Sequence, residues 1–244
     1  MGGELGREEA STIRINQRII LFVLLGAVAI LVLLHMSMQF CDSRNVCGAW
    51  TEVSLKRRYI FDLSGEGNIP TWFSVVQLAA TSLALFATFF IHKDRRKGRL
   101  PWLMLGALFL YLSLDEATDL HGLWINAAPE GMSLQVARSG FDWVLPGSIL
   151  VLLVSLSFLP WLVRLPRRTA VLFFIAAATY VFGGMGLEAV GAFTYLAEAN
   201  SSNILYALVA TAEEALEMIG VTIMLYAVLD SWRGRQFIVI GDAL

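Results

Sequence analysis

Three carboxylates and one histidine fall close together in the stretch SLDEATDLHG, at residues 113–122. The carboxylates are Asp115, Glu116 and Asp119, and the histidine is His121. The residues before them form a long apolar run, and a charged side chain at the centre of a membrane costs at least ~2.5–3.5 kcal/mol on insertion scales. Such side chains must face one another, a cavity or a cation. The stretch therefore indicates a polar site within an otherwise apolar element.

A second stretch, TAEEALEMIG at residues 211–220, has the same order of acidic, small and apolar residues. Its acids, Glu213, Glu214 and Glu217, align with the three acids of the first stretch. On an α-helix each trio occupies an arc of about 100°, so each helix has one acidic face. His121 lies outside that arc, and we expect it nearer the outer mouth of the site.

Two further polar residues interrupt other apolar runs, namely Glu188 and, more loosely matched to it, Gln77. We expect these two, with Asp119 and His121, to line a path from the outer mouth towards the middle of the membrane. The expected proton or cation ligands are Asp115, Glu116, Glu213, Glu214 and Glu217.

The chemistry of this cluster allows three hypotheses. Crowded carboxylates repel one another when ionised, so they take up protons or a cation, and the preferred function is cation- or proton-coupled transport of an unknown solute. The alternative is a membrane metalloenzyme in which a divalent ion is held by Asp115, Glu116, Glu214 and Glu217. Oxygen ligands suit Mg, Ca or Mn, but the Glu-x-x-His pairs of di-iron bundles are missing. The third hypothesis is a structural or scaffold role, with the acids holding helices together.

The composition is that of a membrane protein with several spans. Of the 244 residues, 57% are hydrophobic and 16% are charged, whereas a soluble domain carries about 25% charged residues. Six apolar runs approach the ~20 residues that cross a bilayer as helix. They are residues 19–40, 70–91, 100–125, 141–163, 171–196 and 204–229. The sequence thus predicts an all-α bundle of six transmembrane helices. The third and sixth would run in opposite directions, which suggests an inverted repeat of three plus three helices.

The charges predict the orientation. Of the eighteen Lys and Arg residues, thirteen fall in residues 1–18, 92–99, 164–168 and 230–244, which places both termini in the cytoplasm by the positive-inside rule. The expected organisation is a tail at 1–18, a membrane domain at 19–229 with an outer loop at 41–69, and a tail at 230–244. Cys41 and Cys47 would then lie outside, either as a short-loop disulfide or as two thiols.

The stretches NIPTWFS, SLDEATDLH, GLEAVG and EEALEMIG resemble those of an uncharacterised family of bacterial membrane proteins, often labelled hypothetical protein or multidrug transporter. The resemblance covers most of the membrane part and implies six spans in the inner membrane. The acid that this family carries after the histidine is replaced here by Gly122. The expected partners are the lipid bilayer and a small solute or cation, a homo-oligomer is compatible with the sequence, and no feature indicates binding to nucleic acid.

Overall fold

The computed structural model describes residues 11–13, 16–44, 59–91, 98–120, 144–191, 204–233 and 237–239. Within them the fold is a bundle of six long helices, which confirms the all-α class. The helices are α1 (Gln17–Arg44), α3 (Ile69–Ile91), α4 (Leu100–Thr118), α6 (Val144–Leu162), α7 (Arg167–Val181) and α9 (Ile204–Asp230). A π-helix, η4 (Phe182–Leu187), continues α7.

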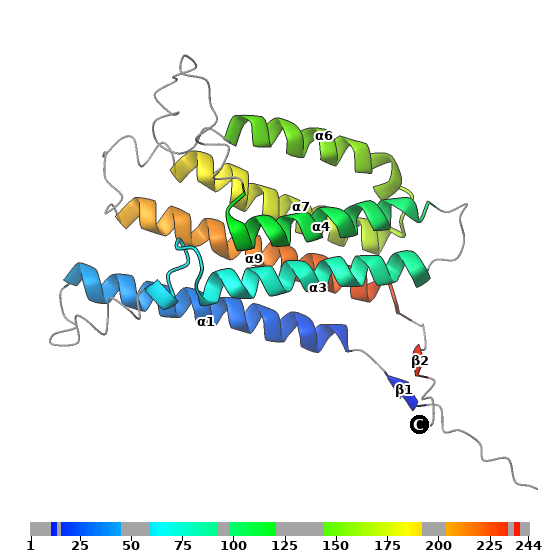
Figure 1. Ribbon diagram of the computed structural model, residues 1–244, viewed down its shortest axis with the longest axis horizontal. Helices are drawn as coiled ribbons and strands as arrows, with labels where there is room; N and C mark the ends of the chain where they lie inside the picture. Colours follow the sequence, from blue (N-terminus) through cyan, green and yellow to red (C-terminus); the bar gives the residue numbers. More distant parts are fainter. Residues whose placement is uncertain are drawn as a thin grey trace, which may run out of the picture.

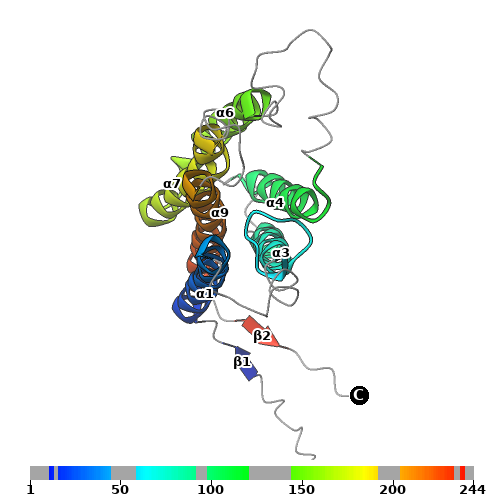
Figure 2. The same ribbon diagram turned by 90° about the vertical axis from the view of Figure 1, so that its left-hand side faces the viewer.

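Successive helices run in alternating directions along the bundle (Figure 1). Seen from one end, α1, α9, α7 and α6 form one row, and α3 and α4 lie beside it (Figure 2). The most extensive contacts are between α3 and α4 and between α7 and α9, while α9 also packs against α1 and α3. α9 is therefore the central helix of the bundle.

Four helices are long and apolar enough to cross a membrane. They are Gln17–Phe40, Ile69–Ile91, Leu100–Thr118 and the continuous helix Arg167–Gly191. α6 is also apolar but is shorter, over Pro146–Leu162, and α9 has 27 residues but carries three carboxylates near its middle. This set of helices is that of a membrane protein.

The third predicted helix, residues 100–125, has an earlier end in the structure. α4 ends at Thr118, because Asp119 adopts the left-handed conformation with φ 51° while its N–H bonds to the carbonyl of Asp115 at 2.7 Å. Asp is among the few residues other than Gly that tolerate this conformation. Asp115 and Glu116 therefore lie in the last turn of α4 and Asp119 follows it, so the predicted end of this helix at residue 125 was wrong.

The predicted fifth span begins earlier, at Arg167, and contains a π-helix. A π-helical turn inserts an extra residue into the α-helical repeat, and such turns are frequent at functional sites. Here the turn contains Gly183 and Gly184 and is followed directly by Glu188. The irregular backbone thus precedes the acidic residue that interrupts this span.

Both tails meet at one end of the bundle. β1 (Ser11–Ile13) pairs with β2 (Phe237–Val239) in an antiparallel two-stranded sheet. This sheet lies beyond the N-terminal end of α1 and the C-terminal end of α9 (Figure 1). The two tails are therefore on the same side of the bundle.

Aromatic and charged contacts between helices are found at the same end of the bundle. Trp102 of α4 packs edge-on against Trp161 of α6 and Phe173 of α7, with ring centroids 5.0 and 5.6 Å apart. Asp230, at the end of α9, is buried and accepts a hydrogen bond from Nε of Arg168 at 2.7 Å. Nε of Arg233 lies 3.1 Å from the same carboxylate. These contacts join α4, α6, α7 and α9.

We expect Asp230→Ala to destabilise the protein moderately. Removing one partner of a buried ion pair costs about 3–5 kcal/mol, but the side chains of Arg168 and Arg233 are 57% and 45% exposed. Because water can solvate the two guanidinium groups, the loss should be closer to ~1–2 kcal/mol. Thermal unfolding in detergent should show a midpoint lowered by several degrees. Arg164→Ala, an exposed arginine at the same end, is the control, and an equal shift in both variants would contradict the role of Asp230.

Candidate functional site

The acidic residues of the two sequence stretches gather in the half of the bundle away from the contacts around Asp230, between its middle and its other end. Asp115 and Glu116 come from the last turn of α4, Glu188 follows the π-helix, and three glutamates come from α9. All of these side chains are partly buried, so each keeps some access to the surface. The structure therefore brings together three helices that are distant in sequence.

Two glutamates of α9 are central to this group, because each interacts electrostatically with carboxylates of other helices. Glu217 interacts with Glu116, Glu213, Glu188 and Asp115. Glu214 interacts with Glu217, Glu116, Glu66 and Glu188. We call the six residues Asp115, Glu116, Glu188, Glu213, Glu214 and Glu217 the acidic cluster. Its members are close enough that the charge of one affects the others.

Glycines determine how closely the helices of the cluster approach. A Cβ at Gly183 would lie 3.0 Å from the carbonyl oxygen of Glu213, and one at Gly184 would overlap the carboxylate of Glu217. On the facing helix, a Cβ at Gly220 would lie 2.7 Å from the backbone nitrogen of Tyr180. The backbones of α7, the π-helix and α9 are thus in direct contact, and Glu217 lies over Gly184. Gly183, Gly184 and Gly220 therefore allow the close packing of these helices.

Tyr180 is a neighbour of the cluster that the sequence did not reveal. It interacts electrostatically with Glu217, Glu116, Asp115 and Glu214. Within an apolar run a single tyrosine is unremarkable. The sequence offered one signal, which is the spacing of Tyr180. It precedes Gly183 by three residues and Gly184 by four, which places these three residues on one face of a helix.

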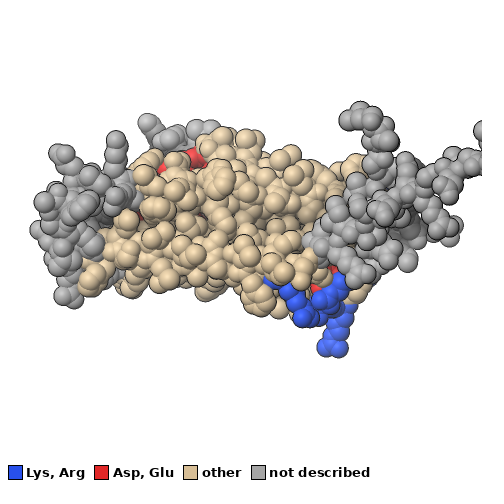
Figure 3. Space-filling model, turned by 90° about the horizontal axis from the view of Figure 1, so that it is seen from below, with Lys and Arg blue, Asp and Glu red and all other residues tan. Residues whose placement is uncertain are grey.

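The charges of the bundle are separated along its length. The arginine side chains that the structure describes lie at the end opposite the acidic cluster, as the ends of their helices show. They are Arg18, Arg99, Arg164, Arg167, Arg168 and Arg233. A space-filling view shows part of this basic group at one end and acidic atoms towards the other (Figure 3). The arginine side chains that the structure describes are therefore too far from the acidic cluster to neutralise its charge.

Gln77 lies deeper in the bundle, between α3 and α9, and is only 2% exposed. Its Nε2 donates a hydrogen bond to Oγ1 of Thr222 at 2.7 Å. Thr222 follows Glu214 by eight residues, which is ~12 Å along a helix. Oε1 of Gln77 has no hydrogen-bond partner among the described residues, and a buried polar atom without one costs about 1–3 kcal/mol. Gln77 is therefore a polar position on the side of the acidic cluster that faces the arginines.

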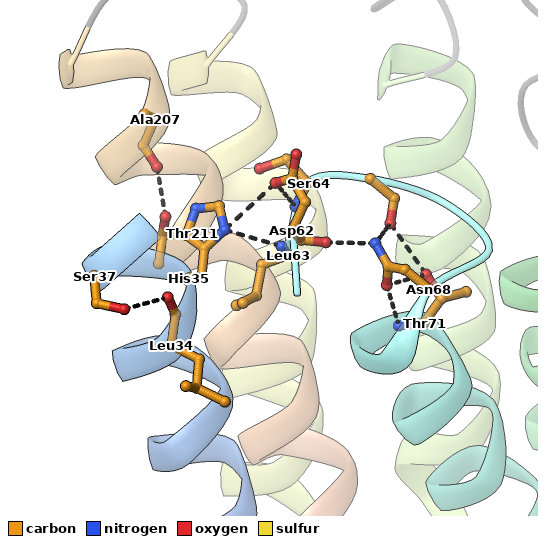
Figure 4. A network of polar contacts seen from close by, with 11 residues as sticks. Leu34, His35, Ser37, Asp62, Leu63, Ser64, Asn68, Thr71, Ala207 and Thr211 are labelled. Atoms are coloured by element: carbon orange, nitrogen blue, oxygen red, sulfur yellow. Dashed lines mark hydrogen bonds and ion pairs between the residues drawn. The ribbon is translucent and has the colours of Figure 1, made fainter. Parts of the chain in front are cut away.

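A second polar network, which sequence reasoning left outside the site, joins α1 to the segment before α3 (Figure 4). His35 of α1 is buried, and its Nδ1 accepts a hydrogen bond from the N–H of Leu63 at 3.1 Å and lies 3.4 Å from Oδ1 of Asp62. Asn68 caps α3 by accepting a hydrogen bond from the N–H of Thr71 at 3.1 Å. This network holds the segment that carries Glu66, which interacts with the cluster through Glu214.

The remaining predicted site residues have different positions. Asp119 is exposed in the turn after α4. His121 and Cys47 lie outside the described residues, as does the side chain of Cys41. In the part of the chain that the structure describes, no group of three or more His, Cys, Asp or Glu side chains is arranged to hold a metal ion. The metal-ligand role of Asp115, Glu116, Glu214 and Glu217 thus stays a prediction.

Comparison with known proteins identifies a family without a described activity. No curated protein and no solved structure matches the chain. Residues 22–232, which include every helix of the acidic cluster, match the family described as a domain of unknown function (DUF8692), and the chain belongs to this family.

Proposed function

We propose that this chain is a transporter of the bacterial inner membrane, in which the acidic cluster carries a proton or a cation coupled to the movement of a solute. One observation carries the proposal. Partly exposed carboxylates from α4, from α9 and from the end of the helix Arg167–Gly191 meet between the middle and one end of an apolar bundle. Polar and ionisable groups at such depth mark ion pathways and proton relays in membrane proteins.

The architecture supports six spans with both termini in the cytoplasm. α6 and α9 complete an alternating bundle with the four apolar helices (Figure 1). The pairing of β1 with β2 brings both tails to the same end of the bundle, as an even number of spans requires. That end also carries the arginine side chains that the structure describes, and cytoplasmic segments are enriched in arginine. The acidic cluster would then open towards the outer side.

The electrostatics favour a mobile proton or cation over a resident metal. Carboxylates that face one another cannot all be ionised without strong repulsion, unless protons or cations compensate them. A resident divalent ion needs several of these carboxylates around one point, and no such group is found among the described residues. A proton or a transient cation needs only a row of interacting carboxylates.

The contact between α7 and α9 offers a way to couple protonation to movement. Glu217 lies directly over Gly184 of the π-helix. Uptake of a proton removes one charge from this contact, so we expect the two helices to pack more tightly when the cluster is protonated. If one conformation binds the proton more tightly than another, proton binding favours that conformation. A conformational change driven by a ligand requires such a difference in affinity.

Proteoliposomes with a pH-sensitive dye inside provide the test. An imposed pH gradient should collapse faster in vesicles that contain the protein, either on its own or when Na⁺, K⁺, Mg²⁺ or Mn²⁺ is added outside. Flux equal to that of empty vesicles under every one of these conditions would contradict the proposal and favour the scaffold role.

A further inference from the structure

An open hollow of about 570 Å³ lies between α7 and α9 at the basic end of the bundle. It is lined by Arg167, Arg168, Val171, Leu172 and Tyr226. The position is far from the acidic cluster, and the transport proposal does not use it. Its walls combine two guanidinium groups with apolar side chains.

The two arginines have different environments. Arg168 is held in place, because it donates hydrogen bonds to Asp230 at 2.7 Å and to the hydroxyl of Tyr226 at 3.0 Å. Arg167, its neighbour, is exposed at the start of α7. The charge of Arg168 is thus fixed in position and partly neutralised by Asp230, while the exposed side chain of Arg167 can reach a ligand in the hollow.

The surroundings favour an anion with an apolar tail. Arg164 and Arg233 lie at the ends of α6 and α9 beside this region, so the local charge is positive even with Asp230 included. One turn further along α7, Val171 is half exposed and Leu172 lines the same hollow. A ligand that contacts both parts must have a negative headgroup next to a hydrocarbon chain.

We propose that this hollow binds an anionic phospholipid of the cytoplasmic leaflet, with its phosphate at Arg167 and its acyl chain along Val171 and Leu172. Basic pockets between transmembrane helices on the cytoplasmic side bind anionic headgroups in this way. Arg suits phosphate because its guanidinium donates two parallel hydrogen bonds. The lipid would contact both α7 and α9 and stabilise their contact from the inner end.

The test uses the full chain, delipidated in detergent and titrated with either phosphatidylglycerol or phosphatidylcholine, with bound lipid counted by native mass spectrometry. The wild type should bind phosphatidylglycerol more tightly than phosphatidylcholine. Arg167→Gln should weaken binding of phosphatidylglycerol by about fivefold, the effect of one arginine near an anionic surface. Binding of phosphatidylcholine should change little.

Two further variants complete the test. Arg99→Gln removes an arginine at the same end of the bundle but outside the hollow, and should leave lipid binding within about twofold of wild type. Val171→Trp should occupy the part of the hollow proposed for the acyl chain and weaken binding of phosphatidylglycerol, while unfolding without lipid is unchanged. Wild-type binding by Arg167→Gln, or full displacement of the lipid by millimolar inorganic phosphate, would overturn the proposal.

Discussion

Glu214→Gln is expected to reduce proton or cation flux in proteoliposomes to the level of empty vesicles. Glu214 interacts with carboxylates from α4, from the end of the helix Arg167–Gly191 and from the segment before α3, so it connects carboxylates of different helices. Glutamine keeps the size of the side chain but cannot bind or release a proton near neutral pH. The measurement is the initial rate of dye response after a pH jump, at equal protein content.

Glu214→Asp is the matched control for this variant. Aspartate retains the carboxylate one methylene further back, so part of the flux should remain. Both variants should unfold within a few degrees of the wild type, because the side chain is partly exposed and its neighbours are acidic. Wild-type flux in Glu214→Gln would show that the cluster does not carry the ion. A large loss of stability in both variants would instead favour a structural role.

Gly220→Leu should produce the largest loss of stability of any substitution considered. A Cβ at this position would lie 2.7, 2.8 and 2.9 Å from the backbone nitrogen, Cβ and Cα of Tyr180. These are atoms of the facing helix itself, so relief requires α7 and α9 to move apart. Overpacking costs about 1–3 kcal/mol and occasionally more, and we expect about 3 kcal/mol here. The midpoint of thermal unfolding in detergent should fall by ~6–12 °C.

Gly26→Leu provides a control with the same chemical change. No atom lies within 4 Å of a Cβ built at Gly26 of α1, and leucine has a higher helix propensity than glycine by about 0.8 kcal/mol. This variant should be as stable as the wild type or slightly more stable. If the two substitutions lowered the midpoint equally, the close approach of α7 and α9 at Gly220 would not be what stabilises the bundle.

The inverted repeat is the part of the predicted fold that the packing supports least. α3 with α4 and α7 with α9 form the two most extensive pairs, as a three-plus-three arrangement requires. The first helix of each half behaves differently, however. α1 packs along α9, whereas α6 meets its neighbours through Trp161 near its C-terminal end and Ser148 near its N-terminal end. The repeat thus stays a prediction.

The predicted helix boundaries are accurate where the composition of the sequence changes sharply. They are inaccurate where the local backbone conformation determines the end of the helix. Ile69–Ile91 and Ile204–Asp230 match their predicted limits within one residue, because apolar runs there end at polar or charged residues. The end of α4 depends on a left-handed Asp119, which hydropathy does not reveal. The π-helix after α7 is likewise not revealed by hydropathy, and its Gly183 and Gly184 contact another helix.

The residues of the acidic cluster were likewise predictable from the sequence, whereas two of their neighbours were not. Residue type and spacing alone identified Asp115, Glu116 and the three glutamates of α9, because acids in apolar runs are costly and conspicuous. Tyr180 and Glu66 were missed, since a tyrosine in a span and a glutamate in a loop carry no such signal. Their role as neighbours follows only from the packing of α7 and of the segment before α3.

The sequence by itself determined the class of this protein, an apolar helical bundle with two acidic stretches and a basic end, since hydropathy and charge act locally along the chain. Only the tertiary structure decided that the two acidic stretches meet, with Glu217 over Gly184 and Gln77 between the cluster and the arginines. Such contacts between distant helices depend on how closely backbones can approach. That distance is set by glycines whose partners lie far away in the chain.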